Sequence, residues 1–353
     1  MERLRWSPCG NYRVNYFEEI KIFDTHFGYF FLTLFIAALA CLPFFCDSYL
    51  MFIFNMIGVN IIAALGLNLL TGFTGQISIG HAAFVGIGGY TAGILATKLG
   101  LPFLLALPAA GFVAAFVGLI FGLPSLRLKG LYLAIATLAA QFIIEYIILH
   151  WETLTNGVGG IYMPKPTIFG INVGSDHAFF YVNYSVVLLC LFFSKNLVRT
   201  RIGRAFTAIR DNDRAAEAMG ISLYGYKLLA FAIGSFYAGL AGCMWAYCIT
   251  AISPEQYGIG LSIEYLAMII IGGLGSNLGS VFGAVFMTSL HEVLRVFAEH
   301  ILSVLPQFVG ILMAIREFVF GLIIITFLIF EPDGLANRWR LIKAYFRLWP
   351  FSF

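Results

Sequence analysis

The segment SYLMFIFNMIGVNIIAALGLNLLTGFTGQISIGHAAFVGIGGYTAGILAT, residues 48–97, runs for fifty residues without an Asp, Glu, Lys or Arg. A soluble domain cannot bury so long an uncharged stretch and still keep a hydrated surface. A bilayer can accommodate it, because about 20 apolar residues in one helix cross a hydrocarbon core of ~30 Å. Backbone polar groups in lipid must pair within their own segment, so helices are the expected form. The stretch therefore predicts a polytopic, helical membrane protein.

The composition of the whole chain agrees with this prediction. Of its 353 residues, 60% are hydrophobic and 11% are charged, whereas ordinary globular chains carry about 25% charged residues. The net charge of +3 does not indicate a nucleic-acid partner, because the basic residues stand between apolar segments, where they orient membrane proteins. We expect an all-α integral membrane protein surrounded by lipid.

Hydropathy windows of about 19 residues predict about ten transmembrane helices, some of them short or broken, at residues 28–46, 49–71, 76–97, 102–123, 131–150, 179–197, 228–249, 263–275, 280–300 and 317–330. The third is dense in glycine, at Gly80, Gly86, Gly88 and Gly89. Each glycine lowers helix propensity by ~1 kcal/mol relative to alanine. This span is therefore expected to be broken or re-entrant.

The distribution of basic residues predicts the orientation. With the amino terminus inside, internal segments hold 17 of the 21 Lys and Arg residues, as the positive-inside rule requires. We therefore expect both termini in the cytoplasm. Residues 1–27 form a cytoplasmic segment, 28–335 the transmembrane domain and 336–353 a cytoplasmic tail, with an external loop at 151–178 and an internal loop at 198–227.

The internal loop, residues 198–227, contains a short amphipathic pattern. Residues from Arg204 to Met219 favour one helix that Gly220 would end. Its apolar side chains, at positions 205, 209, 216 and 219, follow helical spacing. Such a helix is either a membrane-surface helix or a docking element for a soluble partner. Small residues at 215, 216 and 220 favour docking, because they permit close packing.

Several motifs, in a fixed order, resemble one family. The run Ala-Ala-x-x-x-Gly at 215–220 is similar to the Glu-Ala-Ala-x-x-x-Gly loop of ABC importer permeases, with Arg214 in place of the usual Glu. The wider pattern resembles the high-affinity branched-chain amino acid ABC importer permeases, and within them the LivM-type subunit. It consists of GFTGQISIGHAAFVGIGGY at 72–90, TNGVGGI at 155–161, RIGRAFTAIRDN at 201–212, AGLAG at 238–242, GGLGSNLG at 272–279 and EPDGL at 331–335.

The resemblance implies that residues 198–227, called the coupling loop from here on, dock on an ATPase subunit. The residues that it places in this role are Gly203, Arg204, Ala205, Arg210, Asp211, Asn212, Ala215, Ala216 and Gly220. It also implies two ATPase subunits that carry ATP and magnesium, a homologous second permease and a periplasmic or lipid-anchored binding protein. The location that it implies is the bacterial inner (plasma) membrane.

The chain carries no nucleotide-binding loop of its own. The pattern G-x-x-x-x-G-K-[ST] does not occur in it, and no Lys follows a Gly. We therefore expect a transport subunit without its own ATPase site, with no cofactor bound by this chain. The histidines are scattered and no metal-ligand cluster occurs, so no metal site is predicted.

Polar residues in and beside the predicted spans are candidates for the translocation path. They are Asn60, Gln76, Ser78, His81 and Gln141. Non-helical backbone at membrane depth is tolerated where it lines a cavity, which favours the glycine-rich stretch. The alternative is that these side chains only bridge helices or cap backbone groups. No span has an ionisable residue at its centre, so ion coupling is not indicated.

The leading hypothesis is a permease subunit that imports leucine, isoleucine or valine with ATP hydrolysed by separate subunits. One alternative keeps the mechanism and changes the cargo to urea, short-chain amides or another amino acid. A second alternative is an ion-coupled secondary transporter that acts alone. A membrane-embedded enzyme is a third, and the chain lacks a catalytic constellation for it.

Overall fold

The computed structural model describes residues 26–125, 128, 130–168, 170–304, 309–331 and 333–348. Most of the predicted amino-terminal segment, residues 1–25, lies outside the described residues, as do Arg127 and Lys129. The chain separates into two compact units, residues 1–52 and 53–353. The first contains α2 (His26–Cys41), the 3₁₀ turn η1 (Leu42–Phe44) and the start of α3.

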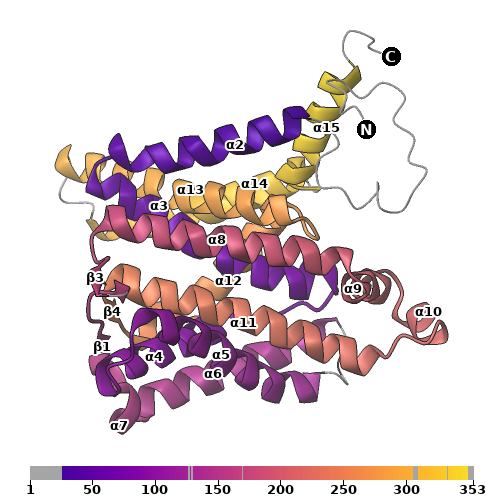
Figure 1. Ribbon diagram of the computed structural model, residues 1–353, viewed down its shortest axis with the longest axis horizontal. Coiled ribbons are helices and arrows are strands. Elements are labelled where there is room, and N and C mark those ends of the chain that lie inside the picture. The colour runs from indigo at the N-terminus through magenta and orange to yellow at the C-terminus, as the bar shows by residue number, and fades with distance from the viewer. Residues whose placement is uncertain are drawn as a thin grey trace. The chain divides into compact units, whose positions relative to one another are not determined.

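Helices make up most of the described part of the second unit, as the sequence predicts. They are the rest of α3 (Ser48–Leu67), which continues as a π-helix η2 (Asn68–Phe73), then α4 (His81–Lys98), α5 (Phe103–Ser125), α6 (Leu131–His150), α7 (Glu152–Thr155), η3 (Gly157–Gly159), α8 (Asp176–Arg199), α9 (Arg201–Asp211), α10 (Asp213–Ala218), α11 (Leu223–Ile249), η4 (Pro254–Tyr257), α12 (Ile259–Gly272), α13 (Asn277–Val304), α14 (Val309–Phe330) and α15 (Leu335–Leu348). Figure 1 labels most of them.

Four two-residue strands, which an all-α prediction does not include, occur in loops of this unit. Strand β1 (Ile161–Tyr162) pairs antiparallel with β4 (Ala251–Ile252), and Ile161 stands opposite Ile252. Strand β2 (Thr167–Ile168) pairs antiparallel with β3 (Ile171–Asn172). The first pair ties the predicted external loop to the residues that follow α11.

Six of the described helices are long and apolar enough to cross a membrane. They are Ser48–Phe73, Phe103–Pro124, Leu131–His150, Asp176–Arg199, Leu223–Ile249 and Asn277–His300. A seventh span results if Phe318–Phe330 and Leu335–Tyr345, bent by 45°, count as one. The predicted count of about ten is therefore not confirmed. Shortness explains part of the difference, because the 14 residues of α12 rise only about 21 Å.

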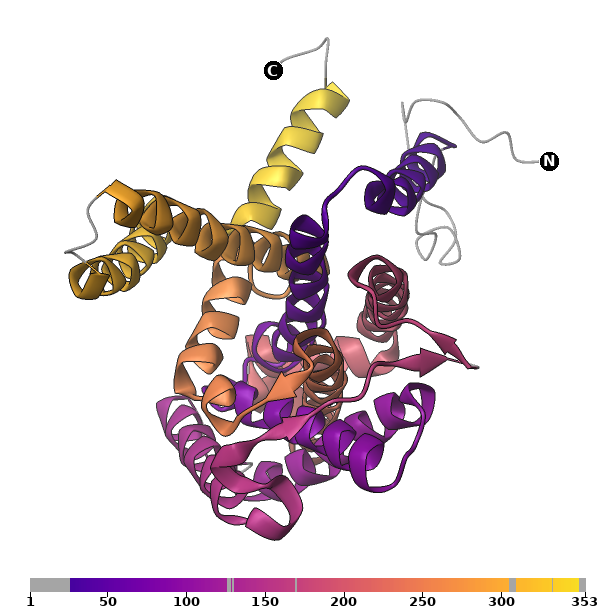
Figure 2. The same ribbon diagram turned by 90° about the vertical axis from the view of Figure 1, so that its left-hand side faces the viewer.

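The core of the second unit is built around α11, which makes its most extensive contacts with α5 and α4. Buried aromatic side chains fill the space between these helices; Phe84 meets Phe231 and Phe103 meets Tyr247, both edge to face. Figure 2, which looks along the long helices, shows α13 and α14 to one side of this group, with α12 between. Helix α12 packs on α13.

Small residues allow these helices to approach closely. A Cβ at Gly88 would lie 2.2 Å from the Gly239 carbonyl oxygen, and one at Gly242 would lie 1.9 Å from that of Val85. In lipid, where no hydrophobic force draws helices together, such contacts do much of the packing. The prediction that Gly86, Gly88 and Gly89 break the third span is wrong, since α4 is continuous from His81 to Lys98.

The predicted start of the third span is also wrong. Residues from Gln76 to Gly80 are not helical, and α4 begins five residues later than expected, at His81. Non-helical backbone thus precedes the helix instead of interrupting it. The polar groups that make this possible are described below.

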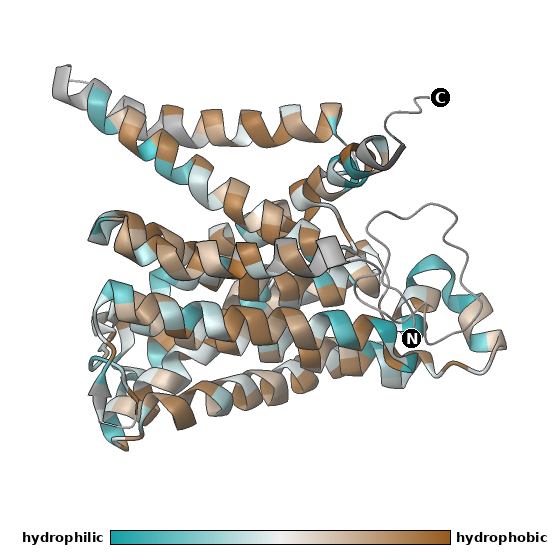
Figure 3. Cartoon of the chain, turned by 45° about the horizontal axis from the view of Figure 1, so that its top comes forward, coloured by the Kyte–Doolittle hydropathy of each residue, from teal (hydrophilic) through white to brown (hydrophobic). Residues whose placement is uncertain are grey.

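The two long loops lie at opposite ends of the second unit. Figure 1 shows β1, β3, β4 and α7 at one end of the long helices and α9 and α10 at the other. Apolar residues dominate the helices between these ends, and hydrophilic residues gather near α9 and α10 (Figure 3). This arrangement fits a helical bundle whose two loops face different sides of a membrane.

Candidate functional site

The coupling loop forms two helices instead of the predicted single one from Arg204 to Met219. Helix α9 ends at Asp211, and Asn212 adopts an extended conformation, with φ −158° and ψ 105°. Its side-chain Oδ1 accepts a hydrogen bond from the Ala215 N–H at 3.1 Å, so Asn212 caps the start of α10. An extended residue cannot continue a helix, and the chain therefore turns at Asn212.

The predicted stop at Gly220 is confirmed. Gly220 has φ +84°, a conformation that glycine adopts without steric cost. The Ile221 N–H donates to the Ala216 carbonyl at 3.0 Å, and the Gly220 N–H donates to that of Glu217 at 2.9 Å. These two bonds form a Schellman motif, which pairs carbonyl groups left free at the end of α10.

Helix α9 is held against the protein while α10 is exposed. Ala205, Phe206 and Ile209 are buried, but on α10 only Ala216 is buried. Met219, whose position suggested that it shares the buried face, is instead 85% exposed. The break at Asn212 explains this exposure. Because α9 and α10 are separate helices, positions 216 and 219 no longer continue the helical spacing of positions 205 and 209.

Two hollows flank α10. One, of about 430 Å³, is lined by the last residues of α9, by Asn212, Asp213 and Arg214, and by the stretch from Thr74 to Gln76. The other, of about 440 Å³, lies between Glu217 and Lys227 at the start of α11. Helix α10 is thus a short ridge between two depressions, a shape that a partner with a complementary groove can grip.

The first residues of the coupling loop have structural roles. A Cβ at Gly203 would lie 2.2 Å from the Val198 carbonyl oxygen, so glycine permits the tight turn between α8 and α9. Ala205 lies on the buried face of α9. Arg204 is exposed, and its Nη1 donates to the Arg199 carbonyl at 3.2 Å.

Arg210 connects the coupling loop to the interior. Its Nη1 donates to the carbonyl oxygen of Gly72, 138 residues away, at 3.0 Å. Its Nε donates to Asp211 Oδ1 at 3.1 Å, and Nη2 lies 3.1 Å from the same oxygen. Asp211 therefore fixes the guanidinium in the orientation that reaches Gly72.

Gly72 belongs to the π-helix η2. This helix packs on the turn between α12 and α13, residues 273–276, called the glycine turn from here on. Asn68, the first residue of η2, donates to the Ser276 carbonyl at 3.0 Å and accepts from the Gly275 N–H at 2.9 Å. A Cβ at Gly275 would lie 2.7 Å from Arg210 Nη1. Single π-turns in helices often mark functional sites. The coupling loop, η2 and the glycine turn thus meet at one point.

Side chains from two other helices, α6 and α12, surround the start of α4. The N–H groups of Ile79, Ala82 and Ala83 donate to Thr137 Oγ1 at 3.0 Å, to Ser262 Oγ at 2.9 Å and to Gln141 Oε1 at 2.8 Å. Gln141 Nε2 also donates to the Tyr257 carbonyl at 2.6 Å. These contacts satisfy the free N–H groups at the helix start, which lets non-helical backbone lie inside the protein.

The candidate path residues are all buried. His81 Nε2 lies 3.0 Å from the Ala63 carbonyl oxygen, and Gln76 Nε2 donates to the Lys227 carbonyl at 3.3 Å. The Ser78 hydroxyl has no hydrogen-bond partner in the described part of the chain. Asn60 is bound elsewhere, because its Nδ2 donates to Thr288 Oγ1 on α13 at 2.9 Å. His81 and Gln141 thus meet at the start of α4, whereas Asn60 bridges α3 and α13.

Two of the residues that bind the backbone at the start of α4 were not predicted from the sequence. Ser262 is a single hydroxyl in an apolar helix, and Tyr257 contributes only its backbone carbonyl. The polar side chain of Asn68 in a span and the apolar side chain of Met219 in a loop could be noted from the sequence. The contacts of Asn68 and the exposure of Met219 could not, because they depend on the tertiary fold.

A substitution at Gln141 tests its structural role. We expect Gln141→Leu to lower the unfolding free energy by about 1–3 kcal/mol, because the buried Ala83 N–H loses its acceptor. The measurement is the melting temperature of the purified protein, with Phe142→Leu on the exposed side of α6 as the control. An unchanged melting temperature for Gln141→Leu would contradict this role.

Comparison with known proteins identifies the family. The model of the family described as "Branched-chain amino acid transport system / permease component" matches residues 49–328. The chain is 32% identical to the high-affinity branched-chain amino acid transport system permease protein LivM of Salmonella typhimurium, over 88% of this chain and 75% of that protein. It is also 32% identical to LivM of Escherichia coli K12, over 80% and 68%.

Another relative is named for a different cargo. The autoinducer 2 import system permease protein LsrC of Enterobacter sp. strain 638 is 27% identical over 84% of this chain and 83% of that protein. No solved structure matches the chain. The family model covers well over half of the sequence, and both LivM proteins are 32% identical to the chain over at least 80% of its length. The chain therefore belongs to the permease family of branched-chain amino acid transport systems.

Proposed function

We propose that this multi-pass membrane protein is a permease subunit of an ATP-binding-cassette importer for branched-chain amino acids. The family and the two LivM relatives support the substrate class. The single observation that carries the mechanism is α10, a capped and exposed helix that stands outside the core between two hollows. A helix of this kind contributes little to the stability of its own fold, and it offers a surface for another protein.

The partners follow from this role. Two ATPase subunits bind ATP and magnesium and receive the coupling loops of two permeases, this chain and a homologous one. A periplasmic or lipid-anchored binding protein delivers the amino acid to the opposite end, where β1 and β4 lie. The coupling loop and both termini then face the cytoplasm of a bacterium, and the chain resides in its inner membrane.

The contacts of Arg210 support a route from the ATPase to the interior. A push on α10 moves α9, and Arg210 carries this movement to the π-helix η2 and the glycine turn through Gly72. A conformational switch requires that the ATPases bind one permease state more tightly than the other. We expect the two permease states to differ in the contacts among Asn68, Gly72, Arg210 and Gly275.

The path residues fit this scheme in part. Gln76 and Ser78 lie on the non-helical approach to α4, and His81 is the first residue of that helix. Gln76 reaches the backbone of Lys227 at the start of α11. Movement of the coupling loop therefore displaces residues 76–81 through this hydrogen bond. We propose that residues 76–81 border the path and that Gln141 positions this segment.

Reconstitution tests the proposal. Proteoliposomes that contain this chain, the second permease, both ATPases and the binding protein are expected to accumulate leucine, isoleucine or valine only when ATP is present. Collapse of the proton and sodium gradients should leave uptake unchanged. Uptake by this chain alone would support a secondary transporter instead, and competition by urea or autoinducer 2, but not by leucine, would overturn the assigned cargo.

A further inference from the structure

The first of the two hollows beside α10, called the polar hollow from here on, has the size of a small-molecule site. Its volume of about 430 Å³ falls within the range of ~300–1,000 Å³ that is common for such sites. One wall is formed by Asp213 and Arg214 of α10, and another by the stretch from Thr74 to Gln76. The start of α6 and the residues before it complete the lining. The polar hollow is therefore large enough for a ligand of the size of an amino acid.

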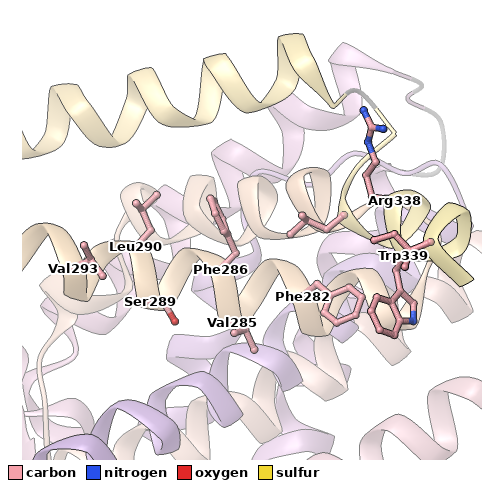
Figure 4. A pocket seen from close by; sticks show the side chains of 10 residues that line it. Phe282, Val285, Phe286, Ser289, Leu290, Val293, Arg338 and Trp339 are labelled. Carbon is pink, nitrogen blue, oxygen red and sulfur yellow. The ribbon is translucent and has the colours of Figure 1, made fainter.

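A larger groove between α13 and α15 offers a different surface. Its volume is about 620 Å³, and Figure 4 shows apolar side chains such as Phe282, Phe286 and Trp339 along it. The charged residue of its lining, Arg338, is already paired with Glu331. Of these two sites, the polar hollow is therefore the one that provides binding partners for a charged small molecule.

The polar hollow carries one positive charge in excess, because three basic and two acidic residues line it. Arg210 is paired with Asp211, whose Oδ1 lies 3.1 Å from the Arg210 Nη2. Lys227 Nζ lies 3.9 Å from Asp213 Oδ2. Arg214 has no hydrogen bond or ion pair within the part of the chain that the structure describes. Its planar guanidinium suits a carboxylate, to which it can donate two parallel hydrogen bonds.

Gln76 and Asp213 provide acceptors for a positively charged group in the same hollow. Gln76 is 4% exposed, and its Nε2 donates to the Lys227 carbonyl at 3.3 Å. Its Oε1 accepts no hydrogen bond from any described residue. A carboxylate has about four lone-pair sites, so Asp213 can accept from a ligand while it stays near Lys227. An α-ammonium group, which has three N–H donors, matches these two acceptors.

The rest of the lining includes aliphatic side chains. Leu128, Leu133 and Ile209 border the polar hollow, and the last two are each 4% exposed. Burial of a branched aliphatic side chain against them removes apolar surface from water, which is favourable. The lining therefore provides separate partners for a carboxylate, an ammonium group and an aliphatic side chain, the three parts of a branched-chain amino acid.

We propose that the polar hollow binds a free branched-chain amino acid from the cytoplasm and that this binding inhibits uptake. The carboxylate lies on Arg214, the ammonium group on Gln76 and Asp213, and the side chain against Leu128 and Leu133. The inference rests on the proposed function, which turns the coupling loop to the cytoplasm and supplies the ligand there as the imported product.

A ligand in the polar hollow joins two parts of the protein that move in the proposed transport cycle. Arg214 belongs to α10, which the ATPase displaces, and Gln76 belongs to the segment that borders the path. Arg210, whose bond to Gly72 connects these parts, also lines the hollow. A ligand that binds one arrangement more tightly than the other shifts the population toward it. Uptake should therefore slow as the imported amino acid accumulates.

Binding is measured with radiolabelled leucine and the full-length chain in lipid nanodiscs. Arg214→Gln should weaken binding by at least about tenfold, because a hydrogen-bonded charge is lost. Arg201→Gln, which removes an exposed arginine outside the lining, should bind as the wild type does. Isocaproate lacks the ammonium group and isoamylamine lacks the carboxylate, so both should compete poorly. Absence of leucine binding, or equal affinity of Arg214→Gln and the wild type, would overturn the proposal.

Inhibition is measured in proteoliposomes that contain the complete transporter, with ATP and either leucine or glutamate inside. The quantity is the ratio of the two rates of valine uptake, which corrects each variant for its own basal activity. When internal leucine is ten times its dissociation constant, about nine-tenths of the sites are occupied, and we expect wild-type uptake to fall about tenfold.

A variant outside α10 shows where the internal leucine acts. Leu128→Glu cancels the excess positive charge of the polar hollow and removes an apolar contact, so it should abolish the inhibition. Leu131→Glu makes the same change at a residue that is 77% exposed and outside the lining, and it should remain inhibited.

Two outcomes of the uptake measurement would contradict the inference. Equal inhibition of Leu128→Glu and the wild type would overturn it, because leucine would then act at another site. Wild-type uptake that internal leucine leaves unchanged would also overturn it, while the proposed function would stand. Absence of ATP-driven uptake even without internal leucine would instead overturn the proposed function, on which the inference rests.

Discussion

Met219→Glu is expected to abolish ATP-driven uptake while leaving the protein folded. Met219 is 85% exposed on the ridge formed by α10 and its end, so its replacement costs the fold little. In the proposed complex we expect the same side chain to be buried against the ATPase, where a carboxylate without a partner is costly. Loss of a central contact residue weakens binding by 2 kcal/mol or more, about 30-fold.

The measurement combines uptake with co-purification of the ATPase subunits. Met219→Glu should lose both, whereas Met219→Leu, which conserves volume and polarity, should keep both. The amount of protein in the membrane should be the same in all three. Normal co-purification with Met219→Glu would show that α10 is not the docking element.

Arg210→Gln is expected to separate ATP hydrolysis from transport. Glutamine is too short to reach the Gly72 carbonyl, so the bond between the coupling loop and η2 is lost, while α10 itself is untouched. Coupling free energies between sites are typically 1–3 kcal/mol, and we expect uptake to fall about tenfold. The ATPase subunits should still bind and hydrolyse ATP.

The decisive quantity is the number of ATP molecules hydrolysed for each amino acid imported, which a purely structural defect would leave unchanged. It should rise for Arg210→Gln and remain normal for Arg201→Gln, an exposed arginine at the start of the same helix. For Arg210→Lys this ratio should lie between those of the other two variants. The single ammonium group of lysine cannot contact Asp211 and Gly72 together as the planar guanidinium of arginine does. If Arg210→Gln instead releases the ATPases, Arg210 belongs to the docking surface.

Periodic and apolar elements were predictable from the sequence. The span at 131–150 coincides with α6, because Lys129 and Glu152 flank a largely apolar stretch and mark its limits. The start of α4 was not predictable, since buried side chains of Thr137, Ser262 and Gln141 take the place of helical hydrogen bonds. Hydropathy measures how well a residue tolerates lipid, and it does not register such partners.

The coupling loop shows the same limit. Its place in the chain followed from composition, and the end of its second helix at Gly220 followed from turn chemistry. The sequence does contain an indication of the break at Asn212, because Asp211, Asn212 and Asp213 are all residues that favour the start of a helix. A single helix was nevertheless the simpler interpretation. The contact between Arg210 and Gly72 joins residues 138 positions apart, and no local pattern encodes it.

Helix α11 runs without a proline from Leu223 to Ile249, about 40 Å at 1.5 Å per residue. Four residues separate its first turn from the end of α10, and β4 follows its last turn. A helix without a kink transmits a displacement of one end to the other. The strand pairing of β4 with β1 then couples residues 151–178 to the opposite end of the long helices, where α9 and α10 lie.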